Sequence, residues 1–185
     1  MSERKTIVVN LLGGPCCGKS VTAAALFVAL KLKGYVVEYA QEFAKQLVWT
    51  KQFNRLDNQH YVTTKQYEIL KQMNGVVDFI VTDGPLSHGL YYNMFNKNNT
   101  SDKDKTNSYI LKCLSEFDNI NIFVERGKFK YETEGRIQSE EEAIEIDTVL
   151  KHVLKQNSID FTVINSQVLE DNINKILELI NSRIN

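Results

Sequence analysis

Five short runs of mostly apolar residues recur along the chain and are separated by longer stretches with helical periodicity. The runs are Thr6–Leu12, Tyr35–Tyr39, Val76–Thr82, Ile120–Val124 and Asp160–Ile164. Apolar side chains on consecutive residues are typical of strands that are covered on both faces. The pattern therefore predicts five buried strands.

The stretches between these runs predict helices. They cover Lys19–Lys33, Gln41–Trp49, Asn54–Met73, Leu86–Phe95, Lys103–Phe117, Ser139–Gln156 and Gln167–Ser182. Gly34 is a good stop for the first helix, and Ser139 with Glu142 forms a capping-box pattern. Alternation of strands and helices indicates an α/β fold, in which right-handed crossovers place helices on both faces of a parallel sheet.

Length and composition are those of one well-packed domain spanning residues 1–185. The chain has 185 residues, of which 43% are hydrophobic, and 22 basic side chains balance 23 acidic ones to give a net charge of -1. No extended basic groove is evident, so nucleic acid is not an expected partner. No stretch approaches the roughly 20 apolar residues of a membrane span. The three cysteines, two of them adjacent, do not suggest a disulfide framework. We expect a protein of the reducing cytoplasm.

The segment GGPCCGKS has the spacing of a phosphate-binding loop, GxxxxGK[ST]. An apolar strand precedes it and a helix follows, so its backbone amides would face an anion at the positive end of the helix dipole. The predicted nucleotide-binding residues are Gly13, Gly14, Pro15, Cys16, Cys17, Gly18, Lys19, Ser20 and Val21. Lys19 would reach the β- and γ-phosphates of ATP, and the Ser20 hydroxyl would bind Mg²⁺. The cysteines are interpreted as compact residues of a turn.

Asp83 ends the third apolar run, in VVDFIVTDGP. An aspartate at the carboxyl end of a strand beside a phosphate loop is placed to hold Mg²⁺, directly or through water. The next residue is Gly84, where hydrolytic ATPases usually carry a carboxylate that activates water, and the segment Asn96–Asn99 lacks the aspartate of a guanine-reading motif. These absences favour a kinase over an ATPase motor or a GTPase switch.

A kinase with a hydroxyl acceptor needs a carboxylate that orients and deprotonates it. Glu38, at the end of the second predicted strand, is our candidate base, and Glu42 lies about one helical turn further on. The segment of about residues 40–75 would bind the acceptor through Glu42, Arg55 and Gln66. It carries a single arginine, Arg55, which favours a nucleoside over a nucleoside monophosphate, although its lysines keep the monophosphate open. His60, His88 and His152 lack metal-ligand spacing and are interpreted as ordinary histidines.

The segment of about residues 126–138, within ERGKFKYETEGR, is polar and basic. It follows the fourth predicted strand, at the edge of the sheet where the phosphates would bind. Positioned cations stabilise the charge of a transferring phosphoryl group, and a closing lid excludes water. We therefore predict a lid in which Arg126 and Arg136 contact phosphate oxygens, since guanidinium groups match them.

The motifs GGPCCGKS, VEYAQEFAKQL, VTDGPL and ERGKFKYETEGRIQSEEEAIEID together resemble the P-loop kinase-like proteins that are common in phages and are grouped with AAA-type ATPases. These are similar to the ribosylnicotinamide-kinase domain of NadR-type proteins and to nucleoside and nucleotide kinases. The resemblance implies a nucleotide-kinase-like three-layer sandwich with a five-stranded parallel sheet in the order 2-3-1-4-5. It also implies ATP and Mg²⁺ as cofactors, and it covers most of the chain. If a phage encodes the protein, the expected cytoplasm is that of the host.

The sequence thus predicts ATP-dependent phosphoryl transfer to a small hydroxyl acceptor, a (deoxy)nucleoside or a related compound. Lys19, Glu38, Asp83, Arg126 and Arg136 would carry the chemistry. Two alternatives stay open: a (deoxy)nucleoside monophosphate kinase, and an ATP-binding regulatory module without a small-molecule acceptor. A homodimer also stays open.

Overall fold

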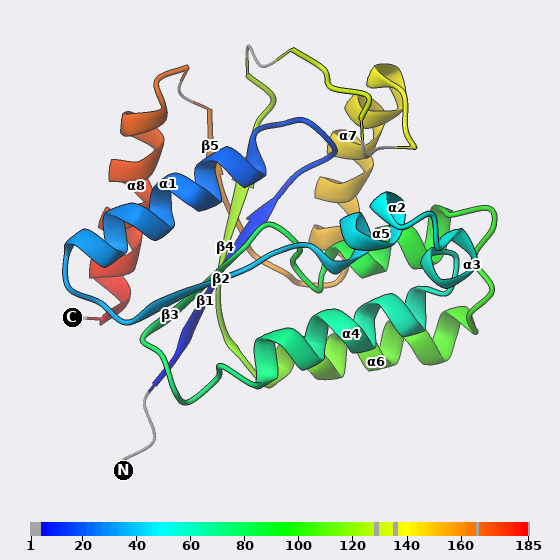
Figure 1. Cartoon of the computed structure of the whole chain (residues 1–185), viewed down its shortest axis with the longest axis horizontal. Helices are drawn as coiled ribbons and strands as arrows, with labels where there is room; N and C mark the ends of the chain where they lie inside the picture. Colours follow the sequence, from blue (N-terminus) through cyan, green and yellow to red (C-terminus); the bar gives the residue numbers. More distant parts are fainter. Residues whose placement is uncertain (1–4, 128–129, 135–136, 166, 185) are drawn as a thin grey trace.

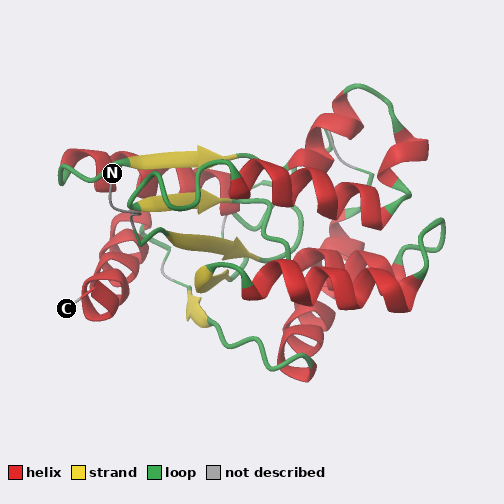
Figure 2. Cartoon of the chain, turned by 90° about the horizontal axis from the view of Figure 1, so that it is seen from below, coloured by secondary structure: helices red, strands yellow, loops and turns green. Residues whose placement is uncertain are grey.

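The computed structural model describes residues 5–127, 130–134, 137–165 and 167–184 (Figure 1). Within them, five parallel strands form one sheet in the order β2-β3-β1-β4-β5. The strands are β1 (Ile7–Leu12), β2 (Val37–Ala40), β3 (Phe79–Thr82), β4 (Asp118–Val124) and β5 (Thr162–Ile164). The predicted α/β fold and strand order are confirmed. Because every pairing is parallel, the carboxyl ends of the strands all meet at one end of the molecule, toward which the long arrows in Figure 2 run.

Helices cover both faces of the sheet. They are α1 (Lys19–Leu32), α2 (Phe43–Trp49), α3 (Phe53–Leu56), α4 (Gln59–Lys71), α5 (His88–Phe95), α6 (Lys103–Ser115), α7 (Glu140–Gln156) and α8 (Leu169–Ile184). Helices α1 and α8 pack on one face, where Leu26 and Ile176 join Val9 in the main core cluster. Helices α4 and α6 pack on the other face, where Leu70 and Cys113 lie against Val8 (Figure 1). Alternate residues of β1 thus face opposite layers, as strand geometry requires.

The differences from the predicted elements lie mainly at their ends. Strand β3 begins at Phe79 and β2 extends to Ala40, while the predicted helix over 54–73 is divided into α3 and α4. Asn58 causes this division because its extended backbone ends α3, and its side chain accepts a hydrogen bond from the Tyr61 amide at 3.0 Å. The capping box of Ser139 and Glu142 at α7 is confirmed.

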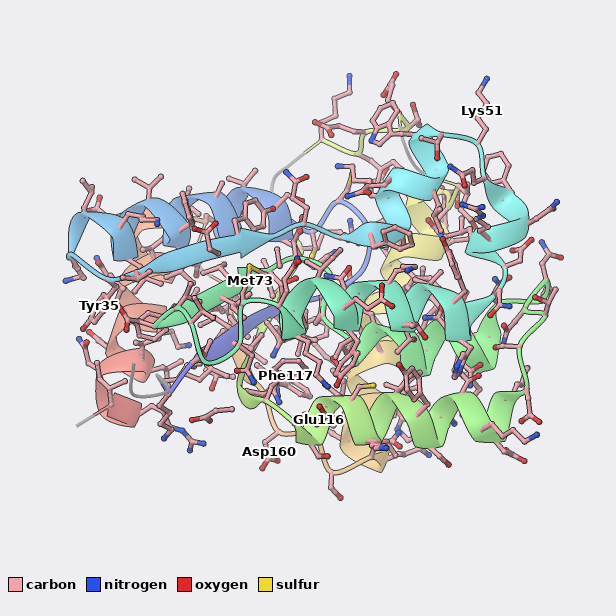
Figure 3. All side chains as sticks on the ribbon, turned by 60° about the horizontal axis from the view of Figure 1, so that its bottom comes forward. Tyr35, Lys51, Met73, Glu116, Phe117 and Asp160 are labelled. Atoms are coloured by element: carbon pink, nitrogen blue, oxygen red, sulfur yellow. The ribbon has the colours of Figure 1, made fainter. Side chains whose placement is uncertain are left out.

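Helices α2 and α3 project beyond the carboxyl ends of the strands. Figure 3 places Lys51, in the turn between these helices, at the opposite end of the molecule from Tyr35, which precedes β2. The segment predicted to bind the acceptor therefore stands at the sheet edge that carries the phosphate loop.

Candidate active site

The phosphate loop connects β1 to α1, and Lys19 is the first residue of that helix. The Lys19 ammonium donates hydrogen bonds to the carbonyl oxygens of Gly13, at 2.8 Å, and Gly14, at 2.6 Å. Lys19 is thus held across the loop at the amino end of α1, where the helix dipole favours an anion. Cys17 is buried in the core, so it acts as a packing residue, while Cys16 is partly exposed.

Ser20 and Asp83 meet beside this loop. The Ser20 hydroxyl donates a 2.5 Å hydrogen bond to Oδ2 of Asp83, which is buried at the end of β3. A hydroxyl and a carboxylate are hard oxygen donors, and Mg²⁺ commonly uses one or two such protein ligands together with phosphates and waters. The pair therefore fits a magnesium ion. Burial and the neighbouring Asp83 carboxylate raise the pKa of Tyr39, so its phenol stays neutral beside this pair.

His88 contacts the first residue of the phosphate loop. It is buried at the start of α5, and its Nε2 accepts a hydrogen bond from the Gly13 amide at 3.3 Å. Burial, and secondarily the charge of Lys19, hold the pKa of His88 well below its usual 6.5. The imidazole is therefore neutral, which leaves Nε2 free to accept. The sequence analysis interpreted His88 as an ordinary histidine, and the structure shows a buried one whose hydrogen bond is satisfied. Its contact with the phosphate loop was not predicted, because no spacing signal links residues 13 and 88.

A cavity of about 560 Å³ opens next to the phosphate loop. Gly13, Pro15 and Lys19 line one end, residues of α2 to α4 line one wall, and α5 contributes Tyr91, Tyr92 and Phe95. Burial, followed by the charge of Glu42, raises the pKa of Tyr92, so this phenol is neutral too. The cavity has room for an acceptor with a flat apolar ring, next to the phosphates of a donor.

Three contacts hold Glu42 at this cavity. Its backbone amide donates to Asp83 Oδ1 at 3.2 Å, and the buried Gln66 amide binds both neighbours. Gln66 Oε1 accepts from the Phe43 amide at 2.8 Å, and Nε2 donates to the Gln41 carbonyl at 3.3 Å. Gly84 permits the approach, because a Cβ on it would lie 2.6 Å from the Glu42 Cα. The chain therefore fixes the backbone of Glu42 beside the Ser20–Asp83 pair.

Two of the residues predicted at the acceptor, Glu38 and Arg55, do not line the cavity. Glu38 is the second residue of β2 and is exposed, 3.9 Å from the Lys31 ammonium. The prediction of Glu38 at the acceptor was wrong because β2 ends at Ala40, so that Glu42, and not Glu38, follows the carboxyl end of the strand. Arg55 is exposed on α3, where it donates to Gln52 Oε1 at 2.8 Å and lies over the Tyr61 ring. Gln66 does line the cavity, but its amide is engaged by the backbone on either side of Glu42.

The predicted lid contacts the phosphate loop. The Glu132 amide donates to Cys16 Sγ at 3.2 Å, and Ile137 and Gln138 line the cavity. Arg126, at the start of the lid, is largely buried and pairs with Asp147 of α7 at 3.0 Å. Arg136 lies outside the described residues, and Val21 is exposed on α1.

Asp147 is a site residue that the sequence analysis missed. Its Oδ1 accepts from the Gly14 amide at 2.6 Å while its Oδ2 binds Arg126. The only sequence signal is an acid beside the apolar stripe of α7, which includes Ala143, Ile146 and Leu150, and such acids are usually solvated. Contacts across 133 residues of chain leave no local pattern to detect.

A family model described as an AAA domain matches residues 8–171, which is most of the chain. The chain belongs to this family. No curated protein matches it. In the described residues of this AAA-domain protein, no helix combines the length and apolarity needed to cross a membrane.

Solved structures of low sequence identity share the fold of this AAA-domain protein. NadR in complex with NAD and AMP-PNP superposes with a TM-score of 0.67 at 13% identity, over 94% of this chain and 49% of the NadR chain. This chain thus spans about half of NadR. Deoxyadenosine kinase from M. mycoides, with the products dCMP and a flexible dCDP, has a TM-score of 0.58 at 22% identity, over 95% of this chain and 99% of the kinase. APE1195 has a TM-score of 0.54 at 15% identity, over 100% and 99% of the two chains.

Proposed function

We propose that this protein is an ATP-dependent kinase that transfers a phosphoryl group to a hydroxyl of a small acceptor, a (deoxy)nucleoside or a related compound. The observation that carries the proposal is the fixed position of Glu42, between the Ser20–Asp83 pair and the cavity. The folds shared with NadR and deoxyadenosine kinase agree with it.

Glu42 acts as the base that orients and deprotonates the acceptor hydroxyl. General-base assistance of this kind is worth about 10²–10⁴ in rate. A carboxylate at the phosphate end of the cavity also repels an acceptor that brings its own dianionic phosphate there. This charge favours an uncharged hydroxyl acceptor over a nucleoside monophosphate.

The other residues bind and orient the donor. Lys19 and the loop amides that follow Pro15 hold the phosphates, and Arg126 supplies a second cation beside Gly14. Ser20 and Asp83 would hold Mg²⁺, which would neutralise charge on the phosphate oxygens. The described part of the lid, against Cys16, limits the access of water to the transferring group.

Measurement of ADP release with ATP, Mg²⁺ and a panel of nucleosides and nucleoside monophosphates tests the proposal. We expect nucleosides to stimulate turnover, and Glu42→Gln to lower kcat about 100-fold or more while the Kd for ATP stays within about threefold. Glu38→Gln is the matched comparison and should retain wild-type turnover, because that carboxylate is exposed away from the cavity. Absence of stimulation by every acceptor would refute the proposal.

A nucleoside monophosphate kinase is the second candidate. Lys45 and Lys97 line the cavity and offer two cations to an acceptor phosphate. Stimulation by monophosphates, without stimulation by nucleosides, would establish this alternative instead.

A further inference from the structure

We infer that Asp147 is a positioning residue, which fixes Arg126 at the phosphate loop and carries a negative charge that Arg126 neutralises there. The inference rests on the proposed function in one respect, namely that the loop binds the phosphates of ATP.

Asp147 joins two segments of the site through its two oxygens. Oδ1 accepts from the Gly14 amide at 2.6 Å, and Oδ2 accepts from Nε and Nη2 of Arg126 at 3.1 and 3.0 Å. Nη2 also donates to the carbonyl oxygen of Ala143 at 3.2 Å. The guanidinium thus has two anchors one turn apart on α7, which restrict its orientation.

The backbone of Gly14 lies close against this arrangement. A Cβ on Gly14 would lie 2.6 Å from the Ala143 carbonyl oxygen, 2.8 Å from Asp147 Oδ1 and 3.4 Å from Arg126 Nη2. The second residue of the phosphate loop, the start of the lid and α7 therefore meet in direct contact. Arg126 is held at the base of the lid, so lid movement does not have to deliver this cation.

The charges explain why the two residues act together. Their side chains are only 18% and 17% exposed, so water screens them weakly. A bare carboxylate on the Gly14 amide would repel the phosphates that the same loop must bind. Arg126 neutralises that carboxylate, and the carboxylate in return reduces the rotamer entropy that Arg126 would lose on binding a phosphate.

The Kd for ATP tests the inference. Titration calorimetry measures it on the wild-type protein, the two single variants Arg126→Met and Asp147→Asn, and the double variant. We expect Arg126→Met to weaken binding about 100-fold, because it removes a cation and exposes the Asp147 charge. Asp147→Asn should weaken binding about threefold to tenfold, because Arg126 loses its fixed orientation. The double variant should bind ATP about tenfold more tightly than Arg126→Met alone, since the unpaired charge is gone.

Asp118→Asn is the matched control, since Asp118 is also 17% exposed and pairs with Arg183 at 2.8 Å, at the opposite end of the sheet. It should leave the Kd unchanged, and thermal unfolding checks that every variant is folded. Equal affinities of Arg126→Met and the double variant, or wild-type affinity of Asp147→Asn, would overturn the inference while leaving the proposed kinase intact. Absence of ATP binding by the wild-type protein would overturn both.

Discussion

Glu42 illustrates how one side chain depends on neighbours from distant parts of the chain. Its backbone is fixed by Asp83 and by Gln66, and Gly84 lies against its Cα. None of these neighbours is recognisable from the sequence around residue 42. The predicted strand ended at Tyr39, one residue before the observed end of β2 at Ala40, and Glu38 was selected as the base although the chain reaches the cavity only at Glu42.

Gly84→Ala should act through Glu42. The new Cβ would lie 2.6 Å from the Glu42 Cα and 3.0 Å from Gln66 Oε1, so the turn that carries the carboxylate must move. We expect kcat to fall about 10–100-fold, which is the range for a displacement of about 1 Å at a reacting centre. Steady-state kinetics in two backgrounds check this: in Glu42→Gln, the alanine should have little further effect. A full additional loss in that background would show that Gly84 acts elsewhere.

At the scale of elements, the boundary between α3 and α4 shapes the acceptor side of the site. Asn58 caps α4, and the adjacent Asp57 carbonyl accepts from the Thr100 amide at 2.8 Å, which joins this boundary to the loop after α5. We expect Asn58→Ala to lower the free energy of unfolding by about 1 kcal/mol, the usual effect of losing an N-cap. Urea denaturation measures the change, with the exposed Asn98→Ala as a control that stays within about 0.5 kcal/mol. An equal loss in both variants would contradict the role of the cap.

The elements themselves were largely predictable, and the contacts between them were not. Apolar runs locate buried strands because water exclusion acts on every residue of the run, and the phosphate loop has a fixed local spacing. The contacts of Gly13 with His88 and of Gly14 with Asp147 join residues 75 and 133 positions apart. Hydrophobic periodicity contains no information on such pairs. The sequence therefore predicts the phosphate loop but not the distant residues that contact it.

At the scale of the whole molecule, the pH dependence of folding reports on the buried contact under the phosphate loop. His88 is neutral in the folded protein because burial and Lys19 lower its pKa below 6.5, whereas in the unfolded chain it takes up a proton near that pH. The unfolded state therefore binds more protons below pH 6.5. The stability contributed by His88 is fully present above pH 6.5 and is lost progressively as the pH falls below it.

We expect the free energy of unfolding to decrease by up to about 1.4 kcal/mol per pH unit as the pH falls from 6.5 to 5.5, and His88→Gln to remove most of this slope. The glutamine amide can still accept from Gly13 but does not titrate. Carboxylates change the free energy of unfolding only at lower pH. Asp118 is an example, because Arg183 and Lys5 hold its pKa below 3.8 despite partial desolvation. Urea denaturation at several pH values measures the slope, with His152→Gln, at an exposed position on α7, as the control that retains it. An unchanged slope in His88→Gln would show that His88 takes up a proton as readily in the folded protein as in the unfolded chain, and the Gly13 amide would then need another acceptor at low pH.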